Sequence, residues 1–303
     1  MTQHIEGLVA ATMTPMTDDG ELNLDVIGTY AEFVVRNGMA GIFVCGSSGE
    51  GMSLSVPERM DVAERWRETL DDQVKVIVHV GHASLADSRT LAEHARKIGA
   101  DAVGAIGPIY HKAATVADLA DHCALIAAAC PELPFYYYHI PVLSGVKCDM
   151  ADFLPAASRR IPNLAGVKFT DENLMDYALC AAMEDGRFDM LFGRDEILLC
   201  ALALGARGAI GTTYNYAAPV YRKVMDRYAA GDVEGARAAQ LDACRLVEVL
   251  RTHGGLRVSK AAMAMLGVDC GPLRSPLRSP SDGQLKIIRA ELEAVGFFDF
   301  ACK

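Results

Sequence analysis

The sequence lacks the features that mark membrane proteins, exported proteins and nucleic-acid-binding proteins. No apolar run approaches the roughly 20 residues of a membrane span, and the N-terminal residues show neither an export signal nor a transit signal. Lysine and arginine number 29 against 39 acidic residues, so the formal net charge of −10 disfavours nucleic acids and anionic membranes as partners. We therefore expect a small-molecule partner, no nucleic acid and no membrane.

Motifs for metals, disulfides and phosphates are also missing. The nine cysteines are odd in number and never spaced as C-x-x-C, so we expect mostly reduced thiols in a cytoplasmic protein. His79 and His82 form an H-x-x-H on or beside a predicted strand, where the two rings diverge, and no third ligand is near. There is no P-loop and no G-x-S-x-G elbow. The sequence therefore predicts no metal site and disfavours the commonest hydrolase and phosphoryl-transfer functions.

What the sequence does contain is a regular alternation of β-rich runs and helical patterns. The runs start about 20 to 35 residues apart, which is the length of a strand plus a crossover helix, so consecutive strands should be parallel. Eight such units predict a closed (β/α)8 (TIM) barrel. A doubly wound sheet is the alternative, although the first run lacks the Gly-rich turn typical of that fold. The predicted strands are Leu8–Thr14, Gly41–Gly46, Val74–Gly81, Ala102–Gly107, Pro134–Ile140, Ala165–Phe169, Phe188–Phe192 and Gly208–Thr213.

Helical patterns fill the gaps between strands and continue alone to the C-terminus. Caps and periodicity predict barrel helices over Ser55–Leu70, Ser84–Ile98, Thr115–Ala129 and Asp195–Leu204. The β pattern stops after Asn215, and further helical stretches follow. We therefore predict a barrel domain over residues 1–218 and a C-terminal helical extension over residues 219–303. The four stretches cover residues 220–232, 233–253, 256–267 and 281–296.

Lys168 is the residue that most strongly suggests chemistry. It lies in an apolar strand near the strand's C-terminal end, where barrel enzymes place their active sites. Burying an ammonium group is costly and lowers its pKa. A lysine that is partly neutral near pH 7 can attack a ketone and form a carbinolamine. Because a closed barrel has no edge strand, a lysine that only reaches out to solvent is the weaker interpretation.

Two further groups lie at predicted strand ends. In the run Tyr136-Tyr137-Tyr138-His139, period-two alternation places Tyr136 and Tyr138 on one face, and Tyr138 is nearer the mouth. Aromatic packing is the alternative role for this phenol. Ser47 and Ser48 stand between glycines, where hydroxyls and backbone N–H groups can bind a carboxylate. A simple capped turn is the alternative interpretation there.

Polar residues also follow the last two predicted strands. Gly193, Asp195 and Glu196 follow the seventh run, and Thr212 follows the eighth. Their carboxylates and hydroxyls can form hydrogen bonds with a polyol, although Asp195 could instead cap the helix after it.

These motifs together resemble the pyruvate-dependent aldolase superfamily that includes dihydrodipicolinate synthase and N-acetylneuraminate lyase. The resemblance runs almost end to end, and it is closest to the animal-type lyase branch. The synthase branch has an arginine shortly after the proline at position 141, whereas Val142-Leu143-Ser144-Gly145 stands here. The matching motifs are G-L-V-A-A-T-M-T-P at 7–15, G-S-S-G-E-G at 46–51, Y-Y-Y-H-I-P at 136–141, G-V-K-F-T-D at 166–171 and G-A-I-G-T-T-Y-N at 208–215.

The resemblance implies a Schiff-base (class I) aldolase that cleaves N-acetylneuraminate reversibly to N-acetylmannosamine and pyruvate without a cofactor. It assigns the imine to Lys168 and proton transfer to Tyr138, with Tyr110 completing a proton relay in some members. Ser47 and Ser48 would bind the carboxylate, with Ser47 also counted in the catalytic set. The family is commonly homotetrameric. The sugar part of the pocket would be lined by Thr170, Gly193, Asp195, Glu196 and Thr212.

Two positions depart from the family pattern, and both keep a hydroxyl. Ser48 stands where threonine is common, and Thr212 stands where the lyases usually have serine. A 2-keto-3-deoxy sugar-acid aldolase would share Lys168 and Tyr138 and would differ around Asp195, Glu196 and Thr212. A non-catalytic protein on the same barrel should have lost the lysine or the tyrosine, and this chain has both.

Overall fold

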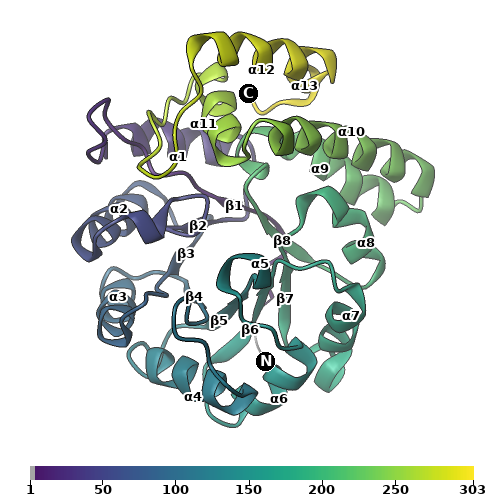
Figure 1. The fold of residues 1–303 in the computed structure, drawn as a ribbon. Coiled ribbons are helices and arrows are strands. Elements are labelled where there is room, and N and C mark those ends of the chain that lie inside the picture. The colour runs from purple at the N-terminus through teal and green to yellow at the C-terminus, as the bar shows by residue number, and fades with distance from the viewer. Residues whose placement is uncertain (1–3) are drawn as a thin grey trace.

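The computed structural model describes residues 4–303 and arranges eight parallel strands in one closed ring. Strands that are consecutive in the chain are neighbours in the ring, and β1 pairs with β8 to close it (Figure 1). This confirms the predicted (β/α)8 barrel and rules out the doubly wound sheet. The strands are β1 Gly7–Ala11, β2 Gly41–Val44, β3 Lys75–His79, β4 Ala102–Ile106, β5 Phe135–His139, β6 Leu164–Phe169, β7 Asp189–Phe192 and β8 Gly208–Gly211.

Each observed strand lies within a predicted β-rich run or within one residue of it. Side chains that point into the barrel alternate with side chains that face the helices, because successive residues of a strand point to opposite faces. On β5, Tyr136 and Tyr138 join the apolar cluster inside the ring, and Tyr137 joins the outer core. The predicted shared face of Tyr136 and Tyr138 is therefore confirmed, and it is the face that points into the barrel.

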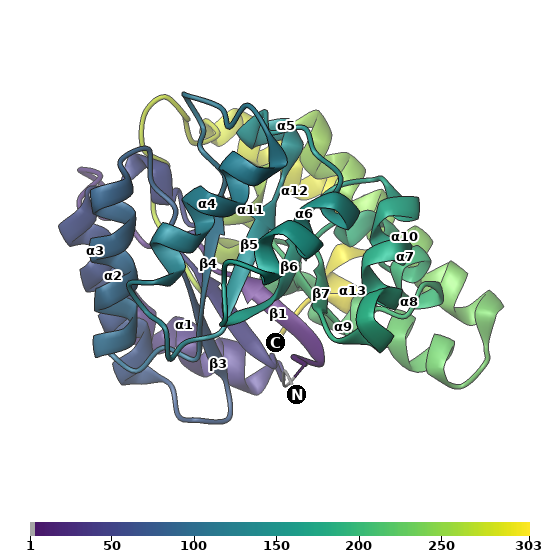
Figure 2. The same ribbon diagram turned by 90° about the horizontal axis from the view of Figure 1, so that it is seen from below.

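Helices surround the ring, and Figure 2 shows them in a view turned by 90°. Helix α2 begins at the predicted cap, where Ser55 and Glu58 form a reciprocal capping box. Helices α1, α6 and α7 and the short helices α5 and α13 were not among the predicted ones. The helices are α1 Val26–Arg36, α2 Val56–Thr69, α3 Leu85–Lys97, α4 Val116–Ala127, α5 Pro141–Ser144, α6 Met150–Ser158, α7 Leu174–Ala182, α8 Leu198–Ala203, α9 Tyr214–Ala229, α10 Val233–Thr252, α11 Leu256–Met265, α12 Asp282–Ala294 and α13 Phe297–Phe300.

The C-terminal helices lie together on one side of the ring, beside α9 (Figure 1). Helix α9 begins at Tyr214, earlier than predicted, and is kinked at Ala217, where φ is −131°. Pro219 accounts for the kink, because proline lacks an N–H and its ring crowds the preceding turn. The predicted domain boundary after residue 218 falls at this kink. No helix within residues 4–303 has the length and apolar character needed to cross a membrane.

Candidate active site

Lys168 lies on β6 inside the barrel, and only 4% of the residue is exposed. Its neighbour across the parallel ladder is Tyr138 on β5. The ammonium nitrogen Nζ lies 4.0 Å from the centroid of the Tyr138 ring and 4.1 Å from that of Phe43 on β2. Lys168 therefore rests on two aromatic rings, away from bulk water.

Burial lowers the pKa of Lys168 to about 7, and the negative charge of Asp195 opposes this shift in part. Near neutral pH, a large fraction of the Lys168 side chain is therefore the free amine. An ordinary lysine, with a pKa near 10.4, is almost fully protonated at that pH. Position and charge state thus suit Lys168 for attack on a carbonyl carbon.

The Tyr138 hydroxyl lies on the same side of the barrel as Lys168 and interacts with the loop after β2. Its oxygen Oη is 3.3 Å from Oγ of Ser47. Burial raises the pKa of Tyr138 to about 12, and the nearby hydroxyls of Ser47 and Thr170 partly offset that effect. The phenol is therefore protonated at neutral pH and begins any reaction as a proton donor.

A second hydroxyl pair joins the loops after β2 and β8. Oγ of Ser48 and Oγ1 of Thr212 are 2.5 Å apart, so one donates a hydrogen bond to the other. Ser48 is buried, whereas Ser47 is exposed. The two hydroxyl pairs thus connect the loops after β2 and β8 with Tyr138 on β5.

Asp195 lies at the beginning of the 3-10 turn Asp195–Ile197 after β7, and it is buried. Its Oδ2 accepts hydrogen bonds from Thr213, at 3.0 Å from the backbone nitrogen and at 2.6 Å from Oγ1. It does not cap the following helix, so that alternative interpretation was wrong. Burial raises the pKa of Asp195 to about 6, against the lowering effect of the hydrogen bonds from Thr213.

The remaining predicted polyol-binding residues cluster around the ends of β6 and β7. Oγ1 of Thr170 is buried and has no hydrogen-bond partner among residues 4–303. Gly193 packs against it so closely that a Cβ there would lie 2.1 Å from that oxygen. Glu196 is partly exposed and lies 3.4 Å from Arg194. A hydroxyl and a carboxylate therefore follow β6, which carries Lys168, and its neighbour β7.

Tyr110 differs from the other predicted site residues. It is 81% exposed, and its ring packs against that of His111 at a centroid distance of 4.9 Å. Within the described part of the chain, its hydroxyl forms no hydrogen bond with Tyr138, which interacts with Ser47. The single chain therefore does not bring Tyr110 into the group around Lys168.

The two histidines of the H-x-x-H pattern have separate local roles. His79 is buried, with Nδ1 at 3.1 Å from the Cys45 carbonyl and Nε2 accepting from the Ile106 N–H at 3.3 Å. Burial and the neighbouring Arg59 charge lower its pKa well below the usual value. His82 instead accepts a hydrogen bond from the Ser84 N–H at 3.0 Å. Both imidazole rings thus form hydrogen bonds with backbone groups around β3.

Sequence reasoning missed two residues that shape the site. Phe43 forms one of the two rings beneath Lys168, and Thr213 holds Asp195. Alternation along β2 could have identified Phe43 as inward-facing, because it belongs to the apolar cluster inside the barrel. No sequence signal linked Thr213 to Asp195, since that contact depends on how β7 and β8 meet.

The model of the dihydrodipicolinate synthetase family matches residues 4–295 of the chain. The chain belongs to this family. Among curated proteins, it is 41% identical to N-acetylneuraminate lyase from Homo sapiens over 301 residues, which cover 98% of the chain and 94% of the relative. It is 43% identical to N-acetylneuraminate lyase A from Xenopus laevis over 284 residues, covering 91% and 92%.

Solved structures show the same relationship. The N-acetylneuraminate lyase of Proteus mirabilis superposes with a TM-score of 0.95 at 39% identity, covering 97% of this chain and 100% of that one. The sialic acid aldolase of Aliivibrio salmonicida also has a TM-score of 0.95 at 39% identity, covering 97% and 98%. The expected lyase-branch resemblance is confirmed. The chain is a carbon–carbon lyase of this family.

Proposed function

We propose that this protein is an N-acetylneuraminate lyase that cleaves sialic acid reversibly into N-acetylmannosamine and pyruvate through an imine on Lys168. The observation that carries the proposal is a buried lysine with a pKa of about 7, packed against a protonated tyrosine at the barrel mouth. The roughly 40% identity to curated lyases over nearly the whole chain supports the choice of substrate.

The first steps use the neutral amine of Lys168. It attacks the C2 ketone of the open-chain sugar acid, and the carbinolamine that forms must lose water to become an iminium ion. Tyr138 is protonated, so it can donate its proton to the departing hydroxyl. The resulting phenolate then lies beside the positively charged iminium, which stabilises it despite the raised pKa.

The bond-breaking step uses the same two residues. The Tyr138 phenolate takes the proton of the C4 hydroxyl, the C3–C4 bond breaks, and its electron pair moves to the iminium to form an enamine. N-acetylmannosamine leaves as the aldehyde. Protonation of the enamine at C3 and attack by water on the imine then release pyruvate and free the lysine. Because the iminium accepts the electrons, the reaction needs no metal or organic cofactor.

The other residues of the pocket form two groups, according to the part of the substrate that each would bind. Ser47 and Ser48 would hold the carboxylate, so that the ketone lies over Lys168. Thr170, Gly193, Asp195, Glu196 and Thr212 would line the polyol end. The Oγ1 of Thr170, unpaired among the described residues, supports its assignment to the polyol end, and the short contact between Ser48 and Thr212 marks where the two ends meet.

The proposal also covers the oligomeric state and the cellular location of the protein. We infer a homotetramer, in which the exposed Tyr110 of one subunit can serve a neighbouring site. Val142, an apolar side chain on α5, is 79% exposed in the single chain and is available to such an interface. The nine free, mostly buried cysteines are consistent with a cytoplasmic enzyme.

Borohydride trapping tests the proposal directly. Incubation with pyruvate and borohydride should add a reduced pyruvyl group to Lys168, detected by peptide mass spectrometry. A panel of aldehydes with pyruvate should then show preference for N-acetylmannosamine over unacetylated aldoses. Labelling of another lysine would refute the assignment, and preference for unacetylated aldoses would indicate a 2-keto-3-deoxy sugar-acid aldolase instead.

A further inference from the structure

Glu50 lies two residues after the Ser47–Ser48 pair and has an unusual environment. Its backbone is left-handed, with φ at 53°, a conformation that a non-glycine residue keeps only when its surroundings enforce it. Its side chain is 1% exposed, although it carries a carboxylate. Since the N–H of Glu50 donates to the Ser47 carbonyl at 3.2 Å, any movement of Glu50 moves the loop that carries both serines.

Both oxygens of the Glu50 carboxylate are held by the C-terminal extension. Oε1 lies 2.9 Å from Nζ of Lys260 on α11, which is 4% exposed and also donates to the Pro272 carbonyl at 2.7 Å. Oε2 accepts a hydrogen bond at 2.8 Å from the backbone N–H of Arg274. A loop at the barrel mouth is thus fixed by residues more than 200 positions away in the chain.

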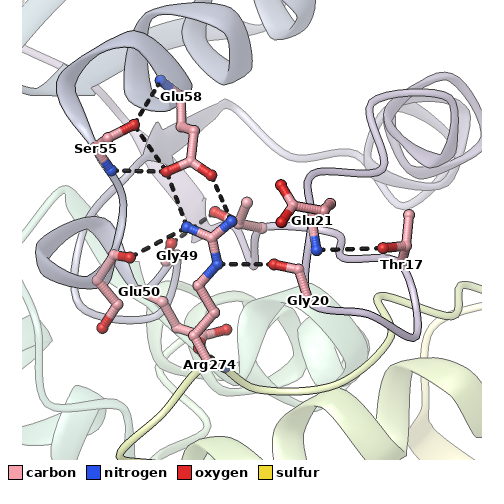
Figure 3. A network of polar contacts seen from close by, with 10 residues as sticks. Thr17, Gly20, Glu21, Gly49, Glu50, Ser55, Glu58 and Arg274 are labelled. Atoms are coloured by element: carbon pink, nitrogen blue, oxygen red, sulfur yellow. Dashed lines mark hydrogen bonds and ion pairs between the residues drawn. The ribbon is translucent and has the colours of Figure 1, made fainter.

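The side chain of Arg274 fixes the segment that follows the loop, as Figure 3 shows. Its guanidinium pairs with the Glu58 carboxylate, with Nη1 at 2.9 Å from Oε2, and its Nε donates to the Gly20 carbonyl at 2.9 Å. Arg274 lowers the pKa of Glu58 to about 2. Glu58 belongs to the capping box of α2, so Arg274 ties the start of this helix to the segment after β1.

We propose that Glu50, Lys260 and Arg274 form a C-terminal latch that positions Ser47 and Ser48 for the carboxylate of the substrate. This inference rests on the proposed function. A buried ion pair is seldom more stabilising than apolar side chains of similar volume, so its use here is better explained by the geometry it imposes. None of the three residues lies among the groups around Lys168, so they act as positioning residues.

The test replaces both buried charges together with Glu50→Gln and Lys260→Met, since a single replacement would leave one buried charge unpaired. The introduced glutamine would retain an oxygen for the Arg274 N–H, and the introduced methionine would retain most of the lysine stem. In the condensation direction, we expect kcat/KM for pyruvate to fall about 10- to 100-fold through a raised KM, because small misplacements of binding groups have effects of this size. The KM for N-acetylmannosamine should rise less than the KM for pyruvate, because the latch reaches the sugar end only indirectly, through the contact of Ser48 with Thr212.

A matched control separates positioning from stability. Lys75→Met with Asp101→Asn removes a partly buried ion pair of 2.8 Å at the beginning of β3, the end of the barrel opposite the site. This control should keep the wild-type KM for pyruvate even if its melting temperature falls. An unchanged KM for pyruvate in the folded latch variant would overturn the latch, and so would an equal change in the control.

A second variant decides the matter if the double latch variant does not fold. Arg274→Lys retains the backbone N–H that binds Glu50 and loses the guanidinium contacts with Glu58 and with the Gly20 carbonyl. The Arg274 side chain is 18% exposed, so this variant should fold. It should raise the pyruvate concentration for half-maximal borohydride trapping, and an unchanged value would overturn the latch. Failure of the wild-type protein to be trapped at Lys168 would instead refute the proposed function.

Discussion

Replacing Lys168 with methionine should abolish catalysis and yet stabilise the fold in a pH-dependent way. Each pKa unit corresponds to about 1.4 kcal/mol, so the fall from 10.5 to about 7 means that charging Lys168 costs the folded protein roughly 5 kcal/mol. The contact of the ammonium with the Phe43 and Tyr138 rings is worth roughly 0.5–2 kcal/mol, too little to reverse the sign. Methionine has a similar length and no charge to bury.

The direction of the pH dependence follows from proton binding. The folded-state pKa of Lys168 is lower than the unfolded-state value, so between pH 7 and pH 10.5 the unfolded chain binds more protons at this residue. The titration of Lys168 therefore increases the free energy of unfolding of the wild type as the pH rises through this window. Methionine does not titrate, so the advantage of Lys168→Met should shrink by about 3 kcal/mol between pH 6 and pH 9.

Urea unfolding of both proteins at pH 6 and pH 9, at one fixed protein concentration, measures this difference. Lys168→Met should have the higher free energy of unfolding at pH 6, and the gap should narrow at pH 9. Lys286→Met, at an exposed position on α12, controls for the loss of a lysine. An equal gap at the two pH values, or a wild type more stable than Lys168→Met at pH 6, would refute the lowered pKa and the argument for a neutral amine.

Three further substitutions test the roles of other site residues. Tyr138→Phe keeps the ring that packs against Phe43, so it should fold normally and lose about 10²–10⁴-fold in kcat. It should still be trapped by borohydride, but more slowly, because the phenol also assists the loss of water; near-normal cleavage would show that Tyr138 serves only in packing. Glu196→Gln should reduce turnover of N-acetylneuraminate while pyruvate trapping at Lys168 persists, and an equal loss of both would disprove the division of the pocket. Gly211→Ala should displace the Asp195 carboxylate, because the new Cβ would lie 1.9 Å from Oδ1, and should raise the KM for the sugar more than that for pyruvate; unchanged kinetics would show that Asp195 can move without consequence.

The local pattern of the sequence was enough to predict most of the barrel. Strand runs, capping residues such as Ser55 and the period of the βα units are properties of short segments, and the structure confirms them. Helices α1, α6 and α7 were missed, as were the single-turn helices α5 and α13. Helix α1 follows Asp25 without a side-chain cap, and α6 contains Pro155, so the usual helix signals are weak or contradictory there.

The candidate site, like the fold, was predicted from the sequence only in part. Lys168 and Tyr138 could be found from the sequence because period-two alternation decides which face of a strand a side chain occupies, and a charged residue on the inner face is conspicuous. Alternation says nothing about which residues of different strands meet. The strand register and the ring closure place Phe43 beneath the lysine and bring Thr213 to Asp195.

The sequence by itself therefore determined the fold class, the inward direction of Lys168 and the motifs of the mouth, because each depends on neighbours close in the chain. Only the tertiary structure decided how far the pKa of Lys168 falls, to about 7, because this depends on how completely the surrounding strands exclude water. It also decided the contact of Glu50 with Lys260. That ion pair joins the second βα unit to α11, and only the packing of the C-terminal helices against the barrel brings the two charges together.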